Sequence, residues 1–289
     1  MHCNMCPRRC DVDRVDNLGV CGMSSGLRVA KAYLHKWEEP CISGDAGSGT
    51  IFFSGCNLKC VYCQNYEISS GGRGYDITPN KLAEIFRMLE DKGASNINLV
   101  SPSHYVVAIK EALDIYKPNI PIVYNSNGYD SIEGLEYLKG YIDIYLVDLK
   151  YMDGEIAGRY SHAIDYPEVA KKAILKMIDL QPENIFEGDM LKKGVIIRHL
   201  VLPNNIENSK ACLKWIKDNV KDPIVSLMGQ YTPMYKASEY PEINRPLKSI
   251  EYKIVEKAML DMGLTNGYTQ ELSSATTDYT PIWDGEGVI

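Results

Sequence analysis

Three cysteines stand close together in the stretch GTIFFSGCNLKCVYCQN, where Cys56, Cys60 and Cys63 are separated by three and then two residues. A short loop with this spacing can place its thiolates around one face of a cubane iron–sulfur cluster. A structural zinc site closes with four ligands and an electron-transfer cluster usually has four cysteines, so three ligands leave one iron open. The alternatives are three packed core cysteines or a zinc site completed by a distant histidine. The position of the loop directly after a predicted strand argues against both.

This spacing after a strand, with the aromatic Tyr62 before the third cysteine, resembles the radical S-adenosylmethionine (SAM) superfamily. The longer string GCNLKCVYCQNYEIS is similar to the branch related to pyruvate formate-lyase activating enzymes. The resemblance implies a 4Fe-4S cluster on Cys56, Cys60 and Cys63, with SAM bound at the open iron. One electron from the reduced cluster then breaks the sulfonium carbon–sulfur bond, which gives methionine and a 5′-deoxyadenosyl radical. It also implies a flavodoxin-type or ferredoxin-type electron donor, and enclosed surroundings for the radical.

A second group of cysteines lies near the N-terminus, in HCNMCPRRC and GVCG, with the pattern Cys3-x2-Cys6-x3-Cys10-x10-Cys21. Four thiolates can bind one zinc ion tetrahedrally, and a 4Fe-4S cluster accepts four thiolates as well. We therefore expect a second metal site here, either an auxiliary 4Fe-4S cluster or zinc, and the redox chemistry implied for the chain favours the cluster. The pattern resembles a subgroup described as similar to pyruvate formate-lyase activating proteins, whereas the activating enzymes themselves usually lack it.

Polar residues also follow the second predicted strand, in the segment NLVSPSH. Many members of the resembled family carry Gly-Gly-Glu here and contact the amino group of SAM with it, so this sequence departs from the family pattern. Ser101, Ser103 and His104 are candidates for contacts with SAM. A helix beginning at Pro102 would add unpaired backbone amides that suit a carboxylate. For His104, a packing or capping role is an equal alternative.

The third and fourth predicted strands end in Asn125-Ser126-Asn127-Gly128 and Asp148-Leu149-Lys150. These segments resemble the Asp-Thr-Asn-Gly and Asp-Leu-Lys segments of the activating enzymes, which surround the methionyl part of SAM and a nearby cation. Asn125 replaces an aspartate and so removes one negative charge. Arg198, in IIRHLVLPNN, matches an arginine of those enzymes, and its fork of donors suits a carboxylate. The resemblance thus implies cofactor contacts by Tyr62, Asn125, Asn127, Asp148, Lys150 and Arg198.

The elements that must position these residues begin at about Gly49, where short β-branched runs alternate with amphipathic helical patterns. Six strand-then-helix units predict an α/β fold with parallel strands, a partial (β/α)6 TIM-like barrel, and the alternative is an open doubly wound sheet. The predicted strands are Thr50–Phe53, Asn96–Val100, Ile120–Tyr124, Asp143–Val147, Val195–Val201 and Ile224–Met228. The predicted helices are Pro79–Lys92, His104–Tyr116, Ile132–Leu138, Glu168–Leu180, Ser209–Val220 and Ser249–Met262.

The chain divides on this interpretation into a Cys-rich N-terminal metal-binding extension, residues 1–48, and a radical SAM partial-barrel domain, residues 49–289. Two long connections, Tyr151–Tyr166 and Tyr231–Leu247, follow strands at the end where chemistry is expected. They are candidates for lids or substrate contacts, and ordinary surface loops without such a role are an equal alternative.

The composition sets limits on function. The 289 residues are 45% hydrophobic and 24% charged, which is typical of globular proteins and excludes a disordered chain. A net charge of −7 disfavours nucleic acid or an anionic membrane as a partner. With no targeting segment or apolar span, we expect a cytoplasmic protein, whose nine cysteines then call for metal rather than disulfides. Cys41 and Cys212 stand apart from the clusters and are expected to be ordinary packed residues.

Three functions compete at this point. The first is activation of a glycyl radical enzyme by hydrogen abstraction from a glycine of that partner. The second is radical modification of a peptide or small molecule, with the N-terminal metal ordering substrate or passing electrons. The third is a non-catalytic metal-binding scaffold, which the unbroken three-cysteine motif argues against.

Overall fold

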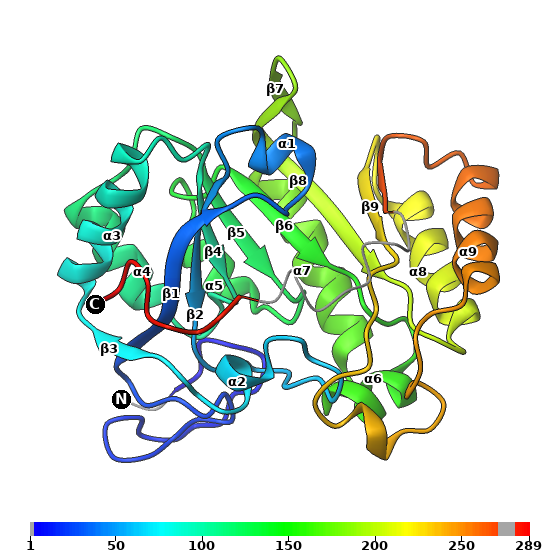
Figure 1. Ribbon diagram of the computed structural model, residues 1–289, viewed down its shortest axis with the longest axis horizontal. Coiled ribbons are helices and arrows are strands. Elements are labelled where there is room, and N and C mark those ends of the chain that lie inside the picture. The colour runs from blue at the N-terminus through cyan, green and yellow to red at the C-terminus, as the bar shows by residue number, and fades with distance from the viewer. Residues whose placement is uncertain (1–2, 271–280) are drawn as a thin grey trace.

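The computed structural model describes residues 3–270 and 281–289, and these residues form a ten-stranded sheet at the centre of the molecule (Figure 1). The six strands predicted from the sequence run parallel to one another and are neighbours in the order of the chain. This order confirms the predicted partial (β/α)6 barrel. The six strands are β2 (Ser48–Phe53), β4 (Ile97–Val100), β5 (Ile122–Ser126), β6 (Ile144–Asp148), β8 (Met190–Leu200) and β9 (Ile224–Met228).

Helices connect these strands on the outside of the sheet, with α3 and α4 at one side of Figure 1 and α8 and α9 at the other. α3 begins as predicted, because the Thr78 side chain accepts a hydrogen bond from the Lys81 amide and Pro79 occupies the first turn. The connecting helices are α3 (Pro79–Asp91), α4 (Val106–Ile115), α5 (Ile132–Tyr137), α6 (Gly154–Ser161), α7 (Tyr166–Leu180), α8 (Ile206–Asn219) and α9 (Ser249–Asp261).

The helix expected to begin at Pro102 begins instead at Val106, so that prediction was wrong. Ser101 takes a left-handed conformation (φ 59°), and the Tyr105 amide bonds to the Pro102 carbonyl in a turn. The Ser103 hydroxyl donates to Asp130 Oδ1 at 2.5 Å, and the ring of His104 bonds to the Ser54 carbonyl at 2.9 Å. These tertiary contacts hold the segment as a turn and delay the start of the helix.

The N-terminal extension also contributes to the sheet, which the sequence did not suggest. β1 (Leu27–His35) runs antiparallel beside β2 and carries β3 (Tyr75–Ile77) on its other edge. The division at residue 48 therefore stays a prediction, although β1 belongs to the same sheet as the barrel strands. Shorter elements complete the fold: α1 (Pro40–Ser43), α2 (Tyr66–Ser69), β7 (Ile185–Glu187), the 3-10 helix η1 (Ala237–Glu239) and β10 (Gly267–Thr269).

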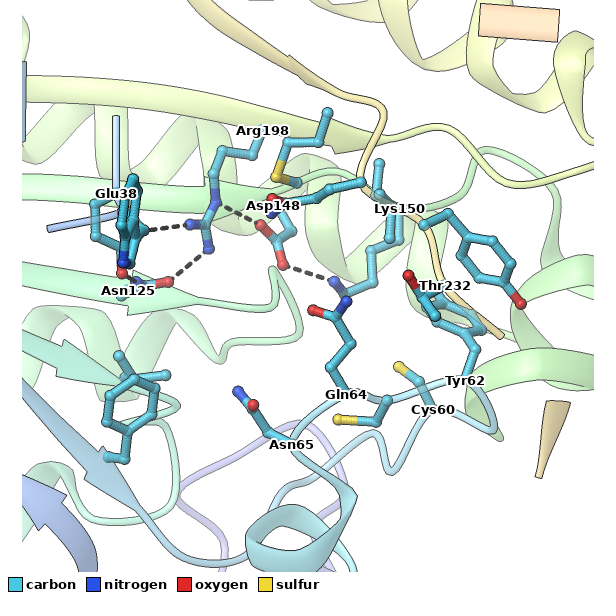
Figure 2. A pocket seen from close by; sticks show the side chains of 18 of the residues that line it. Glu38, Cys60, Tyr62, Gln64, Asn65, Asn125, Asp148, Lys150, Arg198 and Thr232 are labelled. Carbon is cyan, nitrogen blue, oxygen red and sulfur yellow. Dashed lines mark hydrogen bonds and ion pairs between the residues drawn. The ribbon is translucent and has the colours of Figure 1, made fainter. Parts of the chain in front are cut away.

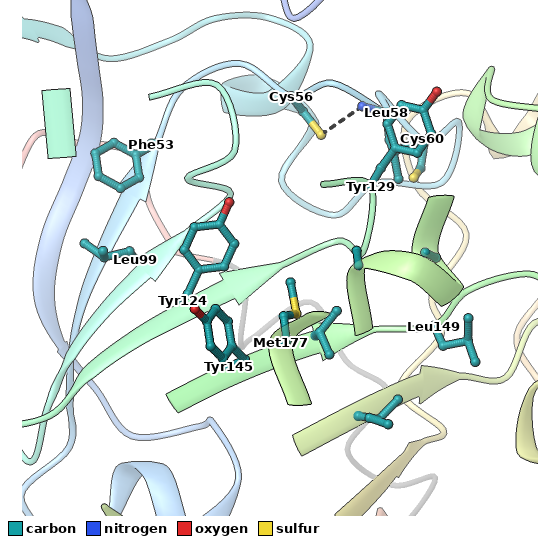
Figure 3. Packing of buried hydrophobic residues seen from close by; sticks show 14 of the residues in the cluster. Phe53, Cys56, Leu58, Cys60, Leu99, Tyr124, Tyr129, Tyr145, Leu149 and Met177 are labelled. Carbon is teal, nitrogen blue, oxygen red and sulfur yellow. Dashed lines mark hydrogen bonds between the residues drawn. The ribbon is translucent and has the colours of Figure 1, made fainter. Parts of the chain in front are cut away.

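The core that supports the site is rich in buried tyrosines as well as aliphatic residues (Figure 3). Tyr124 shows why they are tolerated, because its hydroxyl donates to Asp130 Oδ1 at 2.8 Å and leaves no unpaired polar atom. Cys56 and Cys60 belong to this same packed cluster, and Cys212 is buried on α8 as expected. In the part of the chain that is described, no helix is long and apolar enough to cross a membrane.

The two ends of the barrel differ in what they carry (Figure 1). The loops that follow the parallel strands lie at one end, together with α2, α6 and the N-terminal segment, whereas α1 and β7 lie at the other. The residues predicted to do chemistry therefore gather at the carboxyl ends of the strands, as expected for a parallel barrel.

Candidate functional site

The three-cysteine loop connects the end of β2 to the start of α2. Gly55 begins the loop with φ +84°, a left-handed conformation that favours glycine. A side chain here would also collide, because an added Cβ would lie 2.3 Å from Met23 Cγ. Cys56 and Cys60 are buried and Cys63 is half-buried, and all three are free thiols. The loop thus holds three thiols next to the packed core.

Each of the three sulfurs accepts a hydrogen bond. The Ser161 hydroxyl donates to Cys60 Sγ at 2.9 Å, and the Ser69 hydroxyl donates to Cys63 Sγ at 3.3 Å. Cys56 Sγ accepts from the Leu58 amide at 3.4 Å and from Asn127 Nδ2 at 3.5 Å. Such bonds stabilise thiolate charge and tune the potential of a bound cluster.

The chemistry of this donor set suits iron–sulfur. Three soft thiolates match iron–sulfur or zinc rather than magnesium or calcium. Burial raises the pKa of Cys60 above its ordinary value, while Lys150 acts against the rise. A metal bound at this sulfur would shift the thiol toward its thiolate form. Among the described residues, no three His, Cys, Asp or Glu side chains are drawn together as tightly as the ligands of one metal ion. A four-iron cubane keeps its cysteine sulfurs further apart than a single ion does.

A cavity of about 280 Å³ opens beside this loop (Figure 2). Its wall draws on the loop, on the turn after β1, on the ends of β5, β6 and β8, and on the segment after β9. Seven residues predicted from the sequence border it together: Cys60, Tyr62, Cys63, Asn125, Asp148, Lys150 and Arg198. The predicted residues of four separate elements therefore meet in one place.

Arg198 is the centre of a charged network on the cavity wall (Figure 2). Its guanidinium bonds to Asp148 Oδ1 at 2.9 Å, Glu38 Oε2 at 3.2 Å and Asn125 Oδ1 at 2.6 Å. Lys150 Nζ bonds to the second carboxylate oxygen of Asp148 at 2.6 Å. Asn125 Nδ2 donates to Glu38 Oε1 at 3.2 Å and closes the network. Asn125, which stands where the resembled activating enzymes have an aspartate, thus bridges Arg198 and Glu38.

Interactions within the network set the protonation states of its groups. Burial acts to raise the pKa of Asp148, but the charges of Arg198 and Lys150 outweigh it, so this pKa lies below its ordinary value. Burial acts to lower the pKa of Lys150, but Asp148 and Cys60 outweigh it and hold this pKa above its ordinary value. Burial raises the pKa of Glu38, which Arg198 opposes only in part. Asp148 and Lys150 are therefore a charged pair at the cavity wall.

The other predicted contacts lie away from the cavity. Asn127 Nδ2 reaches Asn57 Oδ1 at 2.9 Å as well as the sulfur of Cys56, so it supports the loop. None of Ser101, Ser103 and His104 is among the described residues that border the cavity. His104 is buried and uncharged, because burial lowers its pKa to about 4. The role of these three residues in cofactor binding stays a prediction that the cavity does not support.

Several cavity residues were missed by the sequence analysis. Gln64 and Asn65 follow the third cysteine directly, and that adjacency was a usable signal. Glu38 gave none, because its partner Arg198 lies 160 residues away along the chain. Ser161, which bonds to Cys60 Sγ but does not border the cavity, gave none either, because it lies on α6, in a segment predicted as a long connection. Other missed residues are His35 and Trp37, whereas Tyr231 and Thr232 lie in the connection Tyr231–Leu247, which was predicted as a candidate for substrate contacts.

A chain of hydroxyl groups connects the cavity wall to the cysteine loop. Tyr62 and Tyr151 share a hydrogen bond at 2.6 Å, and Tyr151 bonds to the Ser161 hydroxyl at 2.8 Å. Because Ser161 uses its proton toward Cys60 Sγ, Tyr151 must donate to Ser161 and Tyr62 to Tyr151. All the donors in this buried chain therefore point toward the sulfur of Cys60.

Comparison with known proteins agrees with this geometry. The Radical SAM superfamily matches residues 50–216, which is more than half of the chain. The uncharacterized protein MJ0674 of Methanocaldococcus jannaschii is 35% identical over 268 residues, covering 89% of this chain and 73% of that protein. The family match includes the three-cysteine loop and the strands as far as β8.

Solved structures share the fold at low identity. SuiB of Streptococcus suis bound to SAM has a TM-score of 0.53 and 15% identity, over 76% of this chain and 49% of SuiB. SuiB bound to its precursor peptide SuiA has a TM-score of 0.50, 15% identity and coverage of 76% and 48%. A radical SAM methyltransferase from Sphaerobacter thermophilus has a TM-score of 0.53 and 13% identity, over 80% of this chain and 69% of that enzyme. This chain spans about half the length of SuiB. On the family match, which covers more than half of its length, the chain belongs to the radical SAM superfamily.

Proposed function

We propose that this protein cleaves SAM reductively at a 4Fe-4S cluster held by Cys56, Cys60 and Cys63, and abstracts a hydrogen atom from a second substrate. Membership of the superfamily implies both the cluster and SAM. When bound, a reduced cluster of this kind supplies the electron that breaks the sulfonium carbon–sulfur bond. The observation that carries the proposal is that one loop holds three free thiols, each with a hydrogen bond to its sulfur, and that two of them, Cys60 and Cys63, border a charged cavity.

The charges of the cavity suit the amino-acid end of SAM. Among the residues that the structure describes, the largely buried cation Lys150 has one carboxylate partner, Asp148, so its remaining donors are available for the carboxylate of SAM. Arg198 already bonds to Asp148, Glu38 and Asn125, so Lys150 is the better candidate for contact with the SAM carboxylate. In this arrangement Arg198 holds the carboxylates of Asp148 and Glu38 in position. The oxygen atoms of Asp148 and Glu38 suit the amino group.

Aromatic rings protect the site from water. Tyr62 is buried and packs edge-on against Tyr160 and Tyr231, with ring centroids 6.5 and 5.8 Å apart. Burial raises the pKa of Tyr62 well above its ordinary value, so its hydroxyl keeps its proton. A dry wall of this kind limits side reactions of a radical.

The second substrate is the finer part of the proposal. We favour a glycine in a protein partner, as in activation of a glycyl radical enzyme, since Asp148-Leu149-Lys150 and Asn125-Ser126-Asn127-Gly128 resemble the activating enzymes. A peptide is the second candidate, favoured by the fold shared with SuiB, which binds the precursor peptide SuiA. A flavodoxin or ferredoxin is the proposed electron donor. A neighbouring gene for a protein with a glycyl-radical segment would separate the two candidates.

The proposal is tested by anaerobic reconstitution of the full chain with iron and sulfide. We expect about four iron atoms to bind at the three-cysteine loop. With a strong chemical reductant, the protein should then convert SAM to methionine and 5′-deoxyadenosine, measured by chromatography and mass spectrometry. A protein that carries the reduced cluster and binds SAM, yet forms no 5′-deoxyadenosine, would overturn the proposal.

Replacing Ser161 by alanine is expected to lower the reduction potential of the cluster. The hydroxyl of Ser161 donates to Cys60 Sγ at 2.9 Å, and loss of a hydrogen bond to a ligating sulfur disfavours the reduced, more negative state. Ser69→Ala is the matched control, since its bond to Cys63 Sγ is longer at 3.3 Å and the shift should be smaller. The measurement is a redox titration followed by electron paramagnetic resonance. A potential that is unchanged or higher in Ser161→Ala would contradict this role.

A further inference from the structure

The N-terminal segment needs something besides a core to hold it. Residues 3–26 are all described by the structure and contain no helix or strand. Its apolar side chains do not form a core of their own, because Val15 is 71% exposed, Leu18 65% and Val20 47%. A segment too small to bury a core of its own is commonly held by disulfides or a metal, and the cysteines of this segment are all free thiols.

The fold brings the four cysteines of this segment together. A Cβ placed on Gly19 would lie 3.2 Å from Cys21 Sγ and 3.6 Å from Cys10 Sγ, so both sulfurs face the space that this glycine leaves. The Cys3 amide donates to the Val12 carbonyl at 3.0 Å and the Cys3 carbonyl accepts from the Asp11 amide at 3.2 Å, which brings Cys3 back beside Cys10. The Arg9 amide donates to the Cys6 carbonyl at 3.0 Å, so a tight turn joins Cys6 to Cys10. The backbone thus returns the four cysteines to one small region, although Cys3 and Cys21 are 18 positions apart in the chain.

A buried arginine compensates negative charge at this place. The guanidinium of Arg14 lies 3.8 Å from Cys3 Sγ, and it also donates to the carbonyls of His104, Met23 and Ser24. Arg14 is only 9% exposed, and a buried cation at this distance would stabilise a thiolate at Cys3. A centre with four thiolates bound to zinc or to a 4Fe-4S cluster carries a net negative charge, which this cation suits.

The same segment is fastened to the loop that carries the radical SAM cysteines. The Cys56 amide donates to the Cys21 carbonyl at 3.3 Å, which joins the two cysteine groups directly through the backbone. Arg8 Nε donates to the Asn57 carbonyl at 2.7 Å. Met23 fills the space over Gly55, as the close approach of its Cγ shows. The N-terminal segment therefore forms one side of the loop.

We propose that Cys3, Cys6, Cys10 and Cys21 bind a metal centre of their own, and that this centre holds the N-terminal segment against the loop at Cys56. The ligands are four thiolates, which suit a 4Fe-4S cluster or one zinc ion. The four sulfurs, like those of the three-cysteine loop, are not drawn together as tightly as ligands of a single ion, so binding would turn the side chains inward. The centre is separate from the proposed site of SAM cleavage and does not depend on it.

The first test removes the loop ligands and leaves the N-terminal ones. In full-length protein with Cys56, Cys60 and Cys63 all replaced by alanine, we expect one metal centre to remain per chain. About four iron atoms with sulfide and cluster absorbance would identify an auxiliary cluster, and about one zinc, in protein purified without added iron, would identify a structural zinc site. Either result supports the proposal. Folded protein with neither metal and with all four N-terminal thiols open to titration would overturn it.

The second test measures the contact between the N-terminal cysteine segment and the loop at Cys56, and it does not depend on activity. Replacing the four N-terminal cysteines by serine should speed hydrogen exchange of the Cys56 amide at least tenfold, because its partner is the Cys21 carbonyl. The Val61 amide of the same loop is the internal control, since it donates to the Tyr160 carbonyl at 2.9 Å, on α6. Equal exchange of Cys56 in the native and serine proteins would overturn the coupling, even if metal is found.

Discussion

Replacing Cys60 by alanine is expected to abolish formation of 5′-deoxyadenosine, down to the level seen without protein. Cys60 borders the cavity, is buried, and accepts the hydrogen bond of Ser161, so its thiol is the best supported of the three. Two thiolates cannot hold a cubane that leaves only one iron open, and iron bound at the loop should be lost along with activity. The measurements are iron content, the electron paramagnetic resonance of the reduced protein, and product formation.

Cys212→Ala is the matched control for this variant. Cys212 is fully buried on α8 and packs as an ordinary core residue, and it belongs to neither cysteine group. Its loss removes one sulfur from a packed core and should lower stability slightly while product formation stays near that of the native protein. Native turnover in Cys60→Ala, or equal loss in both variants, would contradict the assignment of the loop as the cluster site.

Replacing Asp148 by alanine is expected to weaken SAM binding strongly and to destabilise the protein. Asp148 is the shared partner of Arg198 and Lys150, and all three side chains are between 12% and 15% exposed. Removing it leaves Lys150 without its carboxylate partner and Arg198 with Glu38 alone, and breaking a buried pair in this way costs about 3–5 kcal/mol. Iron content should stay unchanged, because Asp148 is not a cluster ligand. Isothermal titration and denaturant unfolding measure the two effects.

Lys150→Ala separates the two parts of this effect. Asp148 keeps its bond to Arg198 in this variant, so stability should fall much less than in Asp148→Ala. Affinity for SAM should still fall, because Lys150 is the proposed partner of its carboxylate. If Lys150→Ala binds SAM as tightly as the native protein with the same iron content, the proposed orientation of SAM is wrong.

Residues close together in the chain could be predicted from the sequence. The spacing of Cys56, Cys60 and Cys63 lies within one loop, and the cap and proline at Thr78-Pro79 lie within one turn of α3. The six parallel strands followed from their apolar runs, since strands buried on both faces read as continuous hydrophobic segments. Local signals were therefore enough for the fold class and the cluster loop.

What escaped prediction depends on contacts between distant segments. Glu38 belongs to no motif in the sequence, and its role depends on the ion pair with Arg198, 160 residues later. α6 was overlooked because its glycines are poor helix formers, and Asp153 compensates by capping the amides of Glu155 and Ile156. The hydroxyl that reaches Cys60 comes from that helix, 101 residues along the chain. The periodicity of the sequence does not indicate such contacts between distant residues.

The separation of these contacts along the chain has a consequence for the order in which the protein matures. All seven clustered cysteines lie within the first 63 residues, whereas Asp148 and Arg198 come 85 or more residues after the last of them. A chain emerges from the ribosome N-terminal end first, so its cysteines are exposed together before the strands that carry the cavity charges exist. Glu38 likewise stays in water until β8 joins the sheet. A chain halted before Arg198 would therefore present every proposed cysteine ligand but no complete cavity for SAM.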